Sequence, residues 1–160
     1  MKYSFEVRQA TTCDAQAISQ ITRESFTKYA QLAGIEPTLL TALTETIDDI
    51  KSDIENKIVL VAFTDGEPVG SVRIELDEAL HTAYLSRFGV RLNSQNNGIG
   101  KSIMNLVDIM MREHGIEHIQ LHTGSKISPL IRFYYGRGFY IESTSTDRGY
   151  IRAALRKDYI

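Results

Sequence analysis

The stretch that decides the fold runs from Tyr84 to Gly115 and reads YLSRFGVRLNSQNNGIGKSIMNLVDIMMREHG. It contains a strand, a glycine-rich turn and a helix that begins directly after the glycines. A helix N-terminus presents backbone N–H groups without intrahelical partners and carries partial positive charge. Gly98 and Gly100 have no side chains, so a bulky anion can approach those amides. The pattern therefore predicts a turn that binds a phosphate-bearing ligand.

Two other phosphate-binding motifs do not fit this turn. A P-loop needs G-x-x-x-x-G-K-[ST], and the residues before Gly100-Lys101-Ser102 place no glycine at its first position. A dinucleotide-binding fingerprint needs G-x-G-x-x-G, and Ile103 stands where its last glycine should be. Taken alone, the two glycines also suit an ordinary strand-to-helix turn.

The chain before this stretch predicts a strand, two helices and an antiparallel meander. Residues 4–8 alternate as a half-buried strand does, and Thr11 with Asp14 resembles a capping box at the start of a helix over 12–30. Pro37 breaks that helix. A second apolar stripe at helical spacing then predicts one helix, with Leu40, Leu43, Ile47, Ile50 and Ile54 on its buried face. Short connections join strands over 58–63, 68–76 and 83–90.

The chain after the glycine-rich turn predicts two helices and three strands. The first helix ends at Gly115, and the strand that follows it, residues 116–123, should run parallel to its predecessor. Ser128 is expected as the N-cap of the last helix, with Pro129 at its first position. Strands over 139–144 and 150–155 complete an α/β (α+β) fold. We expect one domain over 1–160, a mixed, mainly antiparallel sheet of about seven strands flanked by about four helices.

Composition excludes several classes of protein. The net charge of −2 and the pI near 6.1 argue against nucleic acid or an acidic membrane as a partner, because such binding requires a basic face. The single cysteine, Cys13, rules out an intramolecular disulfide and disfavours a cysteine-based metal site. No signal-peptide core is evident, and no run approaches the roughly 20 apolar residues of a membrane span. A cytoplasmic location is the expectation.

The order of these elements and two motifs resemble the GCN5-related N-acetyltransferase (GNAT) superfamily over nearly the whole chain. The family's central motif is Gln or Arg, two residues, Gly, one residue, then Gly or Ala, and it stands here as Gln95-Asn96-Asn97-Gly98-Ile99-Gly100. Downstream, Phe133-Tyr134-Tyr135-Gly136-Arg137-Gly138-Phe139 looks like the family's aromatic segment. The N-terminal segment from Arg8 to Asp14 is a weaker match.

The resemblance implies acetyl-CoA or coenzyme A as co-substrate. Its pyrophosphate would lie on the backbone amides from Asn96 through Ser102, with Lys101 nearby. In this family the pantetheine arm lies between the fourth and fifth strands, which splay apart. Gly89 is a local sign of the bulge or close backbone approach that splaying needs. The implied cofactor residues are therefore Phe88, Val90, Gln95, Asn96, Asn97, Gly98, Ile99, Gly100, Lys101 and Ser102.

Tyr134 matches the family's tyrosine, which lies near the thioester sulfur and protonates the departing thiolate. Read without the resemblance, it is an aromatic core residue, which is the interpretation we favour for Phe133 and Tyr135. A base must also remove a proton from the attacking amine. Glu75, Glu78 and His122 are candidates, and the sequence does not choose among them.

This chain departs from the family at the wall of the pantetheine site. Where many members carry an asparagine that contacts the cofactor, this chain has Ile127, and Leu130 replaces the usual alanine. Ser125 and Lys126 are candidates to replace the missing contact. Asn96 and Asn97 stand where basic residues are common, so phosphate binding should depend on backbone amides.

The expected activity is transfer of an acetyl group directly to a primary amine of a small-molecule or peptide acceptor. The segment from Thr27 to Thr44 should shape the acceptor site, and it holds Lys28, Tyr29, Gln31 and Glu36 without an acidic cluster. Competing interpretations are a non-catalytic acyl-CoA-binding module on the same fold and an unrelated α/β interaction domain. The resemblance also implies a homodimer in which strands such as 150–155 pair between subunits.

Overall fold

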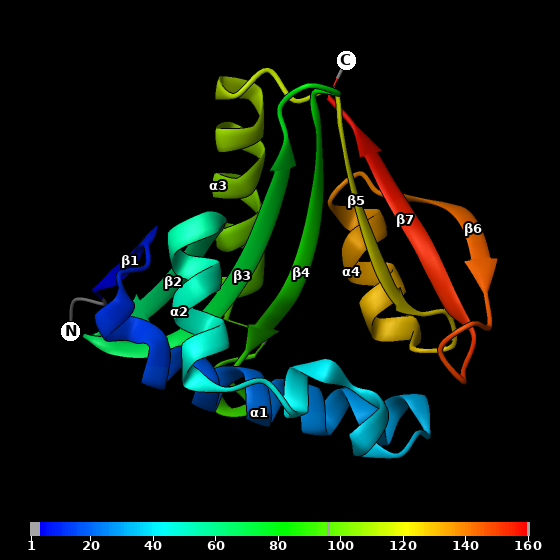
Figure 1. Cartoon of the computed structure of the whole chain (residues 1–160), viewed down its shortest axis with the longest axis horizontal. Coiled ribbons are helices and arrows are strands. Elements are labelled where there is room, and N and C mark those ends of the chain that lie inside the picture. The colour runs from blue at the N-terminus through cyan, green and yellow to red at the C-terminus, as the bar shows by residue number, and fades with distance from the viewer. Residues whose placement is uncertain (1–3, 96, 160) are drawn as a thin grey trace.

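One seven-stranded sheet forms the centre of the protein. The structure is a computed structural model, and it describes residues 4–95 and 97–159. The strand order is β1-β2-β3-β4-β5-β7-β6, and only the β4–β5 pair is parallel. The mixed, mainly antiparallel sheet expected from the sequence is therefore confirmed (Figure 1). The strands are β1 (Phe5–Gln9), β2 (Ile58–Thr64), β3 (Glu67–Asp77), β4 (Thr82–Val90), β5 (His118–Gly124), β6 (Tyr140–Ser145) and β7 (Arg152–Asp158).

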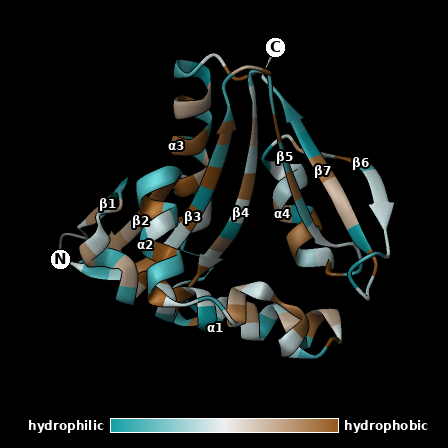
Figure 2. Cartoon of the chain, viewed as in Figure 1, coloured by the Kyte–Doolittle hydropathy of each residue, from teal (hydrophilic) through white to brown (hydrophobic). Residues whose placement is uncertain are grey.

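Helices cover both faces of the sheet. Val59 of β2 packs with Ile18 and Ile50 of the first two helices, whereas its neighbour Leu60 belongs to a second cluster with Ile103. Because successive strand residues point to opposite faces, these two clusters are the two layers of the core. Figure 2 shows apolar segments along β3, β5 and α3 and a paler β6. The helices are α1 (Ala15–Ala33), α2 (Ile47–Asn56), α3 (Ile99–Glu113) and α4 (Ser128–Gly136).

Left-handed residues connect the elements where the sequence predicted turns. Asp65 and Gly66 have φ of 50° and 80°, as the two central residues of a type I′ hairpin require. Gly115 has φ of 69° directly after α3, and the N–H of Ile116 donates to the carbonyl of Met111 at 2.9 Å. These bonds satisfy the carbonyl groups at the helix end. None of the described helices combines the length and hydropathy that a membrane crossing requires.

The single helix expected across Leu40–Ile54 is wrong. Two 3-10 turns, Pro37–Leu39 and Thr41–Leu43, precede an α2 that begins only at Ile47. The reason is a capping box that the apolar stripe concealed. The Thr46 hydroxyl accepts from the Asp49 N–H at 3.1 Å, and the Asp49 carboxylate accepts from the Thr46 N–H at 2.8 Å. The helix therefore starts here, and the preceding turns lie across the end of the sheet.

Two expectations in the last third of the chain also need correction. Ser128 is the first residue of α4 and Ile127 is its N-cap, because the Ile127 carbonyl already accepts from the N–H groups of Leu130 and Ile131. Strand β7 pairs with β5 on one side and β6 on the other. Both of its edges are occupied, so it does not offer the pairing between subunits that the sequence suggested. The outer strands are β1 and β6.

The start of α1 generates the first prediction. Arg8 donates to both carboxylate oxygens of Asp14, at 2.8 and 3.0 Å, and the Thr11 N–H donates to the same carboxylate at 2.7 Å. The hydrogen bonds from Arg8 lower the pKa of Asp14 despite its burial. Asp14→Asn should lower the free energy of unfolding by about 1 kcal/mol at pH 7.

The pH dependence of that loss follows from the direction of the shift. A carboxyl whose pKa is lower in the folded state contributes full stability above its unfolded pKa and loses it as the pH falls through the folded pKa. The difference between wild type and Asp14→Asn should therefore shrink below about pH 4 in urea denaturation. Asp48→Asn, at an exposed site, is the control. A difference equal at pH 7 and pH 3 would contradict the assignment.

Candidate functional site

The separation of β4 from β5 opens the site. The two strands pair only from Thr82 to Tyr84 with residues 118–120, and they then diverge (Figure 1). Along the same part of β4, Val72 of β3 faces two residues, Arg87 and Phe88, and Arg87 has φ of 54°. This is a β-bulge, which bends and twists its strand. The predicted splaying is confirmed by this pairing.

The bulge is formed by Arg87 and Phe88, directly before Gly89, the residue that suggested it. Gly89 instead permits close packing of α1, because a Cβ there would lie 2.6 Å from the Ser25 hydroxyl oxygen. The Ser25 hydroxyl donates to the Val90 carbonyl at 3.3 Å, and the Gln95 amide donates to the same oxygen at 3.2 Å. The end of β4 is thus held by both α1 and the glycine-rich turn.

A larger cleft of about 430 Å³ lies between the end of β4, α1 and the first turns of α3 and α4. Of the ten residues predicted to bind the cofactor, seven line it, Asn97 and Ser102 do not, and Asn96 lies outside the described residues. The seven are Phe88, Val90, Gln95, Gly98, Ile99, Gly100 and Lys101. The sequence-predicted residues therefore converge on one cleft.

The α3 N-terminus faces this larger cleft with free amides. Gly98 is the N-cap at φ of 76°, and the first intrahelical bond runs from the Ser102 N–H to the Gly98 carbonyl at 3.0 Å. The N–H groups of Ile99, Gly100 and Lys101 precede that bond and have no intrahelical partner. The backbone amide of Ser102 is occupied, so the expected cradle is shorter by that residue.

Gly100 lets two aromatic rings of the cleft wall pack closely against the start of α3. A Cβ at this position would lie 3.1 Å from the Phe88 ring and 3.4 Å from the Phe133 ring. Phe88 and Phe133 stack on each other with ring centroids 5.5 Å apart. Phe133 packs against the core, as its interpretation as a core aromatic expected, and it also forms part of the cleft wall. Tyr135 is exposed, so its interpretation as core is wrong.

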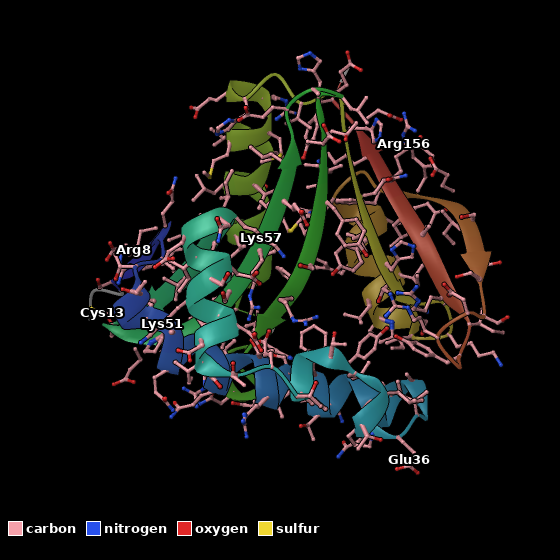
Figure 3. The ribbon with its side chains drawn as sticks, viewed as in Figure 1. Arg8, Cys13, Glu36, Lys51, Lys57 and Arg156 are labelled. Carbon is pink, nitrogen blue, oxygen red and sulfur yellow. The ribbon has the colours of Figure 1, made fainter. Side chains whose placement is uncertain are left out.

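Cations accompany the amides. Lys101 and Lys28 line the larger cleft, and no acidic residue does so among the described residues. The sequence placed Lys28 with the acceptor segment, but Ser25, Lys28 and Leu32 follow helical spacing on one face of α1 and line this cleft instead. That 3.6-residue periodicity was a usable signal. Glu36, from the same predicted segment, lines neither cleft and projects from the far end of α1 (Figure 3).

Ile127 and Leu130, the two residues that depart from the family pattern, leave the α4 side of the larger cleft without a polar side chain. Ile127 is buried against β5, with its side chain 2.8 Å from where a Gly124 Cβ would stand. The Ser125 hydroxyl donates to the Ile151 carbonyl at 3.3 Å, and neither it nor Lys126 lines the larger cleft. On the α4 side the wall of that cleft is therefore apolar, formed by Pro129, Leu130 and Phe133.

A smaller cleft of about 250 Å³ adjoins the larger one. It lies between β4, β5, the 3-10 turns after α1 and the turn that precedes β7. The two clefts share four lining residues, which form a common wall: Phe26, Tyr29, Phe88 and Leu130. The Tyr29 and Tyr150 hydroxyls hydrogen-bond at 2.8 Å and join α1 to the turn before β7. A molecule in each cleft could therefore meet the other at this wall.

Tyr134 lies beside the wall that the two clefts share, in contact with Phe88. Its ring packs edge-on against Phe88, Phe133 and Phe139, and only 5% of the residue is exposed. It lines the smaller cleft, and burial alone raises the pKa of its hydroxyl. No hydrogen bond to this hydroxyl occurs among the described residues. Tyr134 is thus a protonated donor without a competing partner at neutral pH.

Of the three candidate bases, only His122 lies at the site. The Glu75 side chain is 67% exposed beside Lys57, and Glu78 is exposed in the turn after β3. His122 lines the smaller cleft, and its Nδ1 lies 2.6 Å from the Tyr84 hydroxyl. Burial and the nearby Arg152 lower the pKa of His122, which favours the neutral imidazole. A neutral imidazole can accept a proton.

A buried ion cluster that the sequence did not predict lies beside the smaller cleft and connects its walls. Glu45 accepts from Arg73 at 2.7 and 2.8 Å and from Arg87 Nε at 3.3 Å. Arg87 also donates to the Thr41 hydroxyl at 3.1 Å, and Asp53 accepts from Arg73 at 2.9 Å. The cluster joins the bulge of β4 to the turns over the smaller cleft. Among the described residues no group of His, Cys, Asp and Glu is arranged to hold a metal ion.

Solved structures share this fold. PaiA N-acetyltransferase from Thermoplasma acidophilum, in complex with coenzyme A, superposes with a TM-score of 0.85 at 22% identity, over 98% of this chain and 99% of that chain. yncA from Salmonella typhimurium, with its cofactor acetyl-CoA, superposes with a TM-score of 0.77 at 17% identity, over 98% of this chain and 95% of that chain. The ribosomal-protein-S18-alanine N-acetyltransferase from Escherichia coli gives 0.77 at 14% identity over 97% and 94%.

Sequence comparison gives the family independently of the fold. No curated protein matches the chain. A family model does, and it covers residues 16–139, which include the glycine-rich turn, β5 and Tyr134. The matched region spans most of the chain and contains both clefts' principal walls. The chain belongs to the acetyltransferase (GNAT) family.

Proposed function

We propose that this protein transfers an acetyl group from acetyl-CoA to a primary amine, in a direct reaction at the meeting point of the two clefts. The observation that carries the proposal is Tyr134, which is buried, keeps its proton at neutral pH, lines the smaller cleft and packs against Phe88 of the wall that the two clefts share. Family membership supports the acetyltransferase activity. The two clefts support separate places for the donor and the acceptor.

The larger cleft fits coenzyme A in shape and charge. Backbone amides of Ile99, Gly100 and Lys101 lie at a helix N-terminus, where phosphate oxygens bind well. Lys28 and Lys101 supply positive charge, and Gly100 leaves the space that a side chain would fill. The edge of β4 after its separation from β5 offers backbone groups to an amide-containing arm. We assign the pantetheine contact to Phe88 and Val90.

The chain's own residues supply the proton transfers. The thioester of acetyl-CoA supplies an activated acyl group, and the amine nitrogen forms a bond to its carbonyl carbon while the carbon–sulfur bond breaks. His122 accepts the proton that the amine loses. Tyr134 donates its proton to the sulfur and is reprotonated from solvent. The products are the acetylated amine and the free thiol of coenzyme A.

Substitution of Tyr134 tests the catalytic assignment. Tyr134→Phe keeps the packed ring and removes only the hydroxyl, so kcat for thiol release should fall about 100-fold while coenzyme A still binds. Thiol release with a panel of amines measures the rate. Tyr135→Phe, an exposed tyrosine next in the chain, is the matched control and should keep full activity.

Two results would decide against this proposal. Full activity of Tyr134→Phe would remove the tyrosine from the chemistry. Binding of acetyl-CoA without thiol release on any amine would favour the non-catalytic acyl-CoA-binding module instead.

Substitution of Gly100 tests the place of the cofactor. Gly100→Ala puts a methyl group 3.1 Å from the Phe88 ring and so crowds the cleft wall beside the α3 N-terminus, and the Kd for coenzyme A should rise about 10-fold, equivalent to ~1.4 kcal/mol. Isothermal titration calorimetry measures the change. Gly136→Ala is the matched control, because a Cβ there meets nothing within 4 Å and lies outside both clefts. Equal affinity of the two variants for coenzyme A would contradict the assignment of its phosphates to the α3 N-terminus.

A further inference from the structure

The charges around the smaller cleft differ sharply from those of the whole chain. The chain has 20 acidic and 18 basic residues, yet the smaller cleft is lined by three arginines and one histidine. No carboxylate lines it among the described residues. These basic side chains come from β4, β5, β7 and the turn before β7: Arg87, His122, Arg152 and Arg148.

Two of the arginines have charge available for a ligand. Arg87 is held by the buried carboxylate of Glu45 and by Thr41. Arg152 has only Asp147 at 3.5 Å, a side chain that is 65% exposed, and its buried Nε has no hydrogen-bond partner. In the described part of the chain Arg148 forms no ion pair. Among the described residues, Arg148 has no ion pair and Arg152 is held only by the exposed Asp147, so these two arginines are the cations of the smaller cleft most available to a ligand.

The position of Arg152 relates it directly to the proposed base. His122 of β5 is paired with Ala154 of β7, and Arg152 lies two residues before Ala154 on the same strand. Residues two apart on a strand share a face, so Arg152 and His122 are diagonal neighbours, typically about 7–8 Å apart at their Cα atoms. Burial lowers the pKa of His122, and the positive charges of Arg152 and Arg148 lower it further against the opposing charge of Asp147. Burial raises the pKa of Tyr84, and the same two arginines oppose that rise, as positive charge close by does.

We infer that the acceptor is a small amine that also carries a carboxylate or another anionic group, which Arg148 and Arg152 bind. The inference rests on the proposed function and specifies its substrate class. A guanidinium binds a carboxylate with two parallel hydrogen bonds, and the unpartnered Nε of Arg152 is such a donor. With the anion at the arginines, the amine is directed toward His122 and Tyr134. The volume of about 250 Å³ suits a molecule of amino-acid size.

The same charges disfavour a polyamine. Every amine group of a polyamine beyond the reacting one is a cation, and the smaller cleft offers it arginines rather than carboxylates. Positive charge near the reacting nitrogen also lowers the pKa of its ammonium form, so a larger fraction is neutral and able to attack. The arginines thus select an acidic partner and favour its reactive state.

The test compares amines that differ only in charge. Thiol release is measured with β-alanine, γ-aminobutyrate and glutamate, with the neutral amides of the same three compounds, and with spermidine. The wild type should show kcat/KM at least about 10-fold higher for the acids than for their amides, as expected for a charge-assisted hydrogen bond. Spermidine should be the poorest substrate.

Substitutions then assign the preference to residues. Arg148→Gln and Arg152→Gln should each reduce the acid-to-amide ratio of kcat/KM about 10-fold, mainly through KM. Arg148→Glu should reverse the preference toward spermidine. Arg156→Gln is the matched control, because Arg156 lies on the same strand and face as Arg152 but outside the smaller cleft (Figure 3). Arg148 is exposed in a turn, so its variants test the inference even where Arg152→Gln does not fold.

A binding measurement gives a second readout. The thermal shift produced by γ-aminobutyrate in the presence of coenzyme A should exceed that of its amide in the wild type and be lost in Arg148→Gln. Acetylation of amides or spermidine as fast as the acids, unchanged in the arginine variants, would overturn the inference and leave the proposed function intact. Absence of thiol release with every amine would remove the proposed function, and the acceptor inference with it.

Discussion

The structure depends on how soon β4 and β5 stop pairing. After three pairs the strands separate, and the bulge at Arg87 and Phe88 turns the remainder of β4 away from its neighbour. Backbone groups that a continuous ladder would have used stay available to a ligand. Both clefts lie along this separation, one toward α3 and the other toward β7. The larger cleft therefore exists because the pairing of β4 with β5 is interrupted.

The protein stabilises that interruption from both sides. Toward α1, Ser25 and Gln95 hold the Val90 carbonyl. Toward α2, the buried Arg73 and the bulge residue Arg87 share the carboxylate of Glu45. A buried charge is costly unless it is paired, so this cluster specifies one arrangement of the turns after α1. The strained backbone of Arg87 is held by the same ion pairs that position the acceptor side.

Local signals explain what the sequence could predict. Gly98 and Gly100 before an apolar stripe identify the helix start, and Tyr134 lies in a short motif within a helix whose first turn Pro129 marks. The apolar stripe from Leu40 to Ile54 led to the wrong helix start, because two 3-10 turns followed by a helix keep the same apolar spacing as one continuous helix. Thr46 and Asp49 mark the true start of α2. Capping residues were the better evidence there.

The arginines of the smaller cleft could not be predicted from local patterns. Arg148 and Arg152 reach the smaller cleft only because β7 enters the sheet between β5 and β6, and strand order cannot be read from periodicity. The same holds for Tyr29 and Tyr150, which are 121 residues apart in the chain. The larger cleft is built largely from contiguous motifs, whereas the smaller cleft is built from residues that only the tertiary fold brings together.

The wall common to the two clefts has a thermodynamic consequence. Phe88 faces both clefts and stacks on Phe133, so a molecule that enters the larger cleft changes the surface met by a molecule in the smaller one. Binding free energies of the two ligands are then coupled, and the coupling must be the same in both directions. The factor by which a ligand in the larger cleft changes the affinity of the smaller cleft is the factor by which a ligand in the smaller cleft changes the affinity of the larger one.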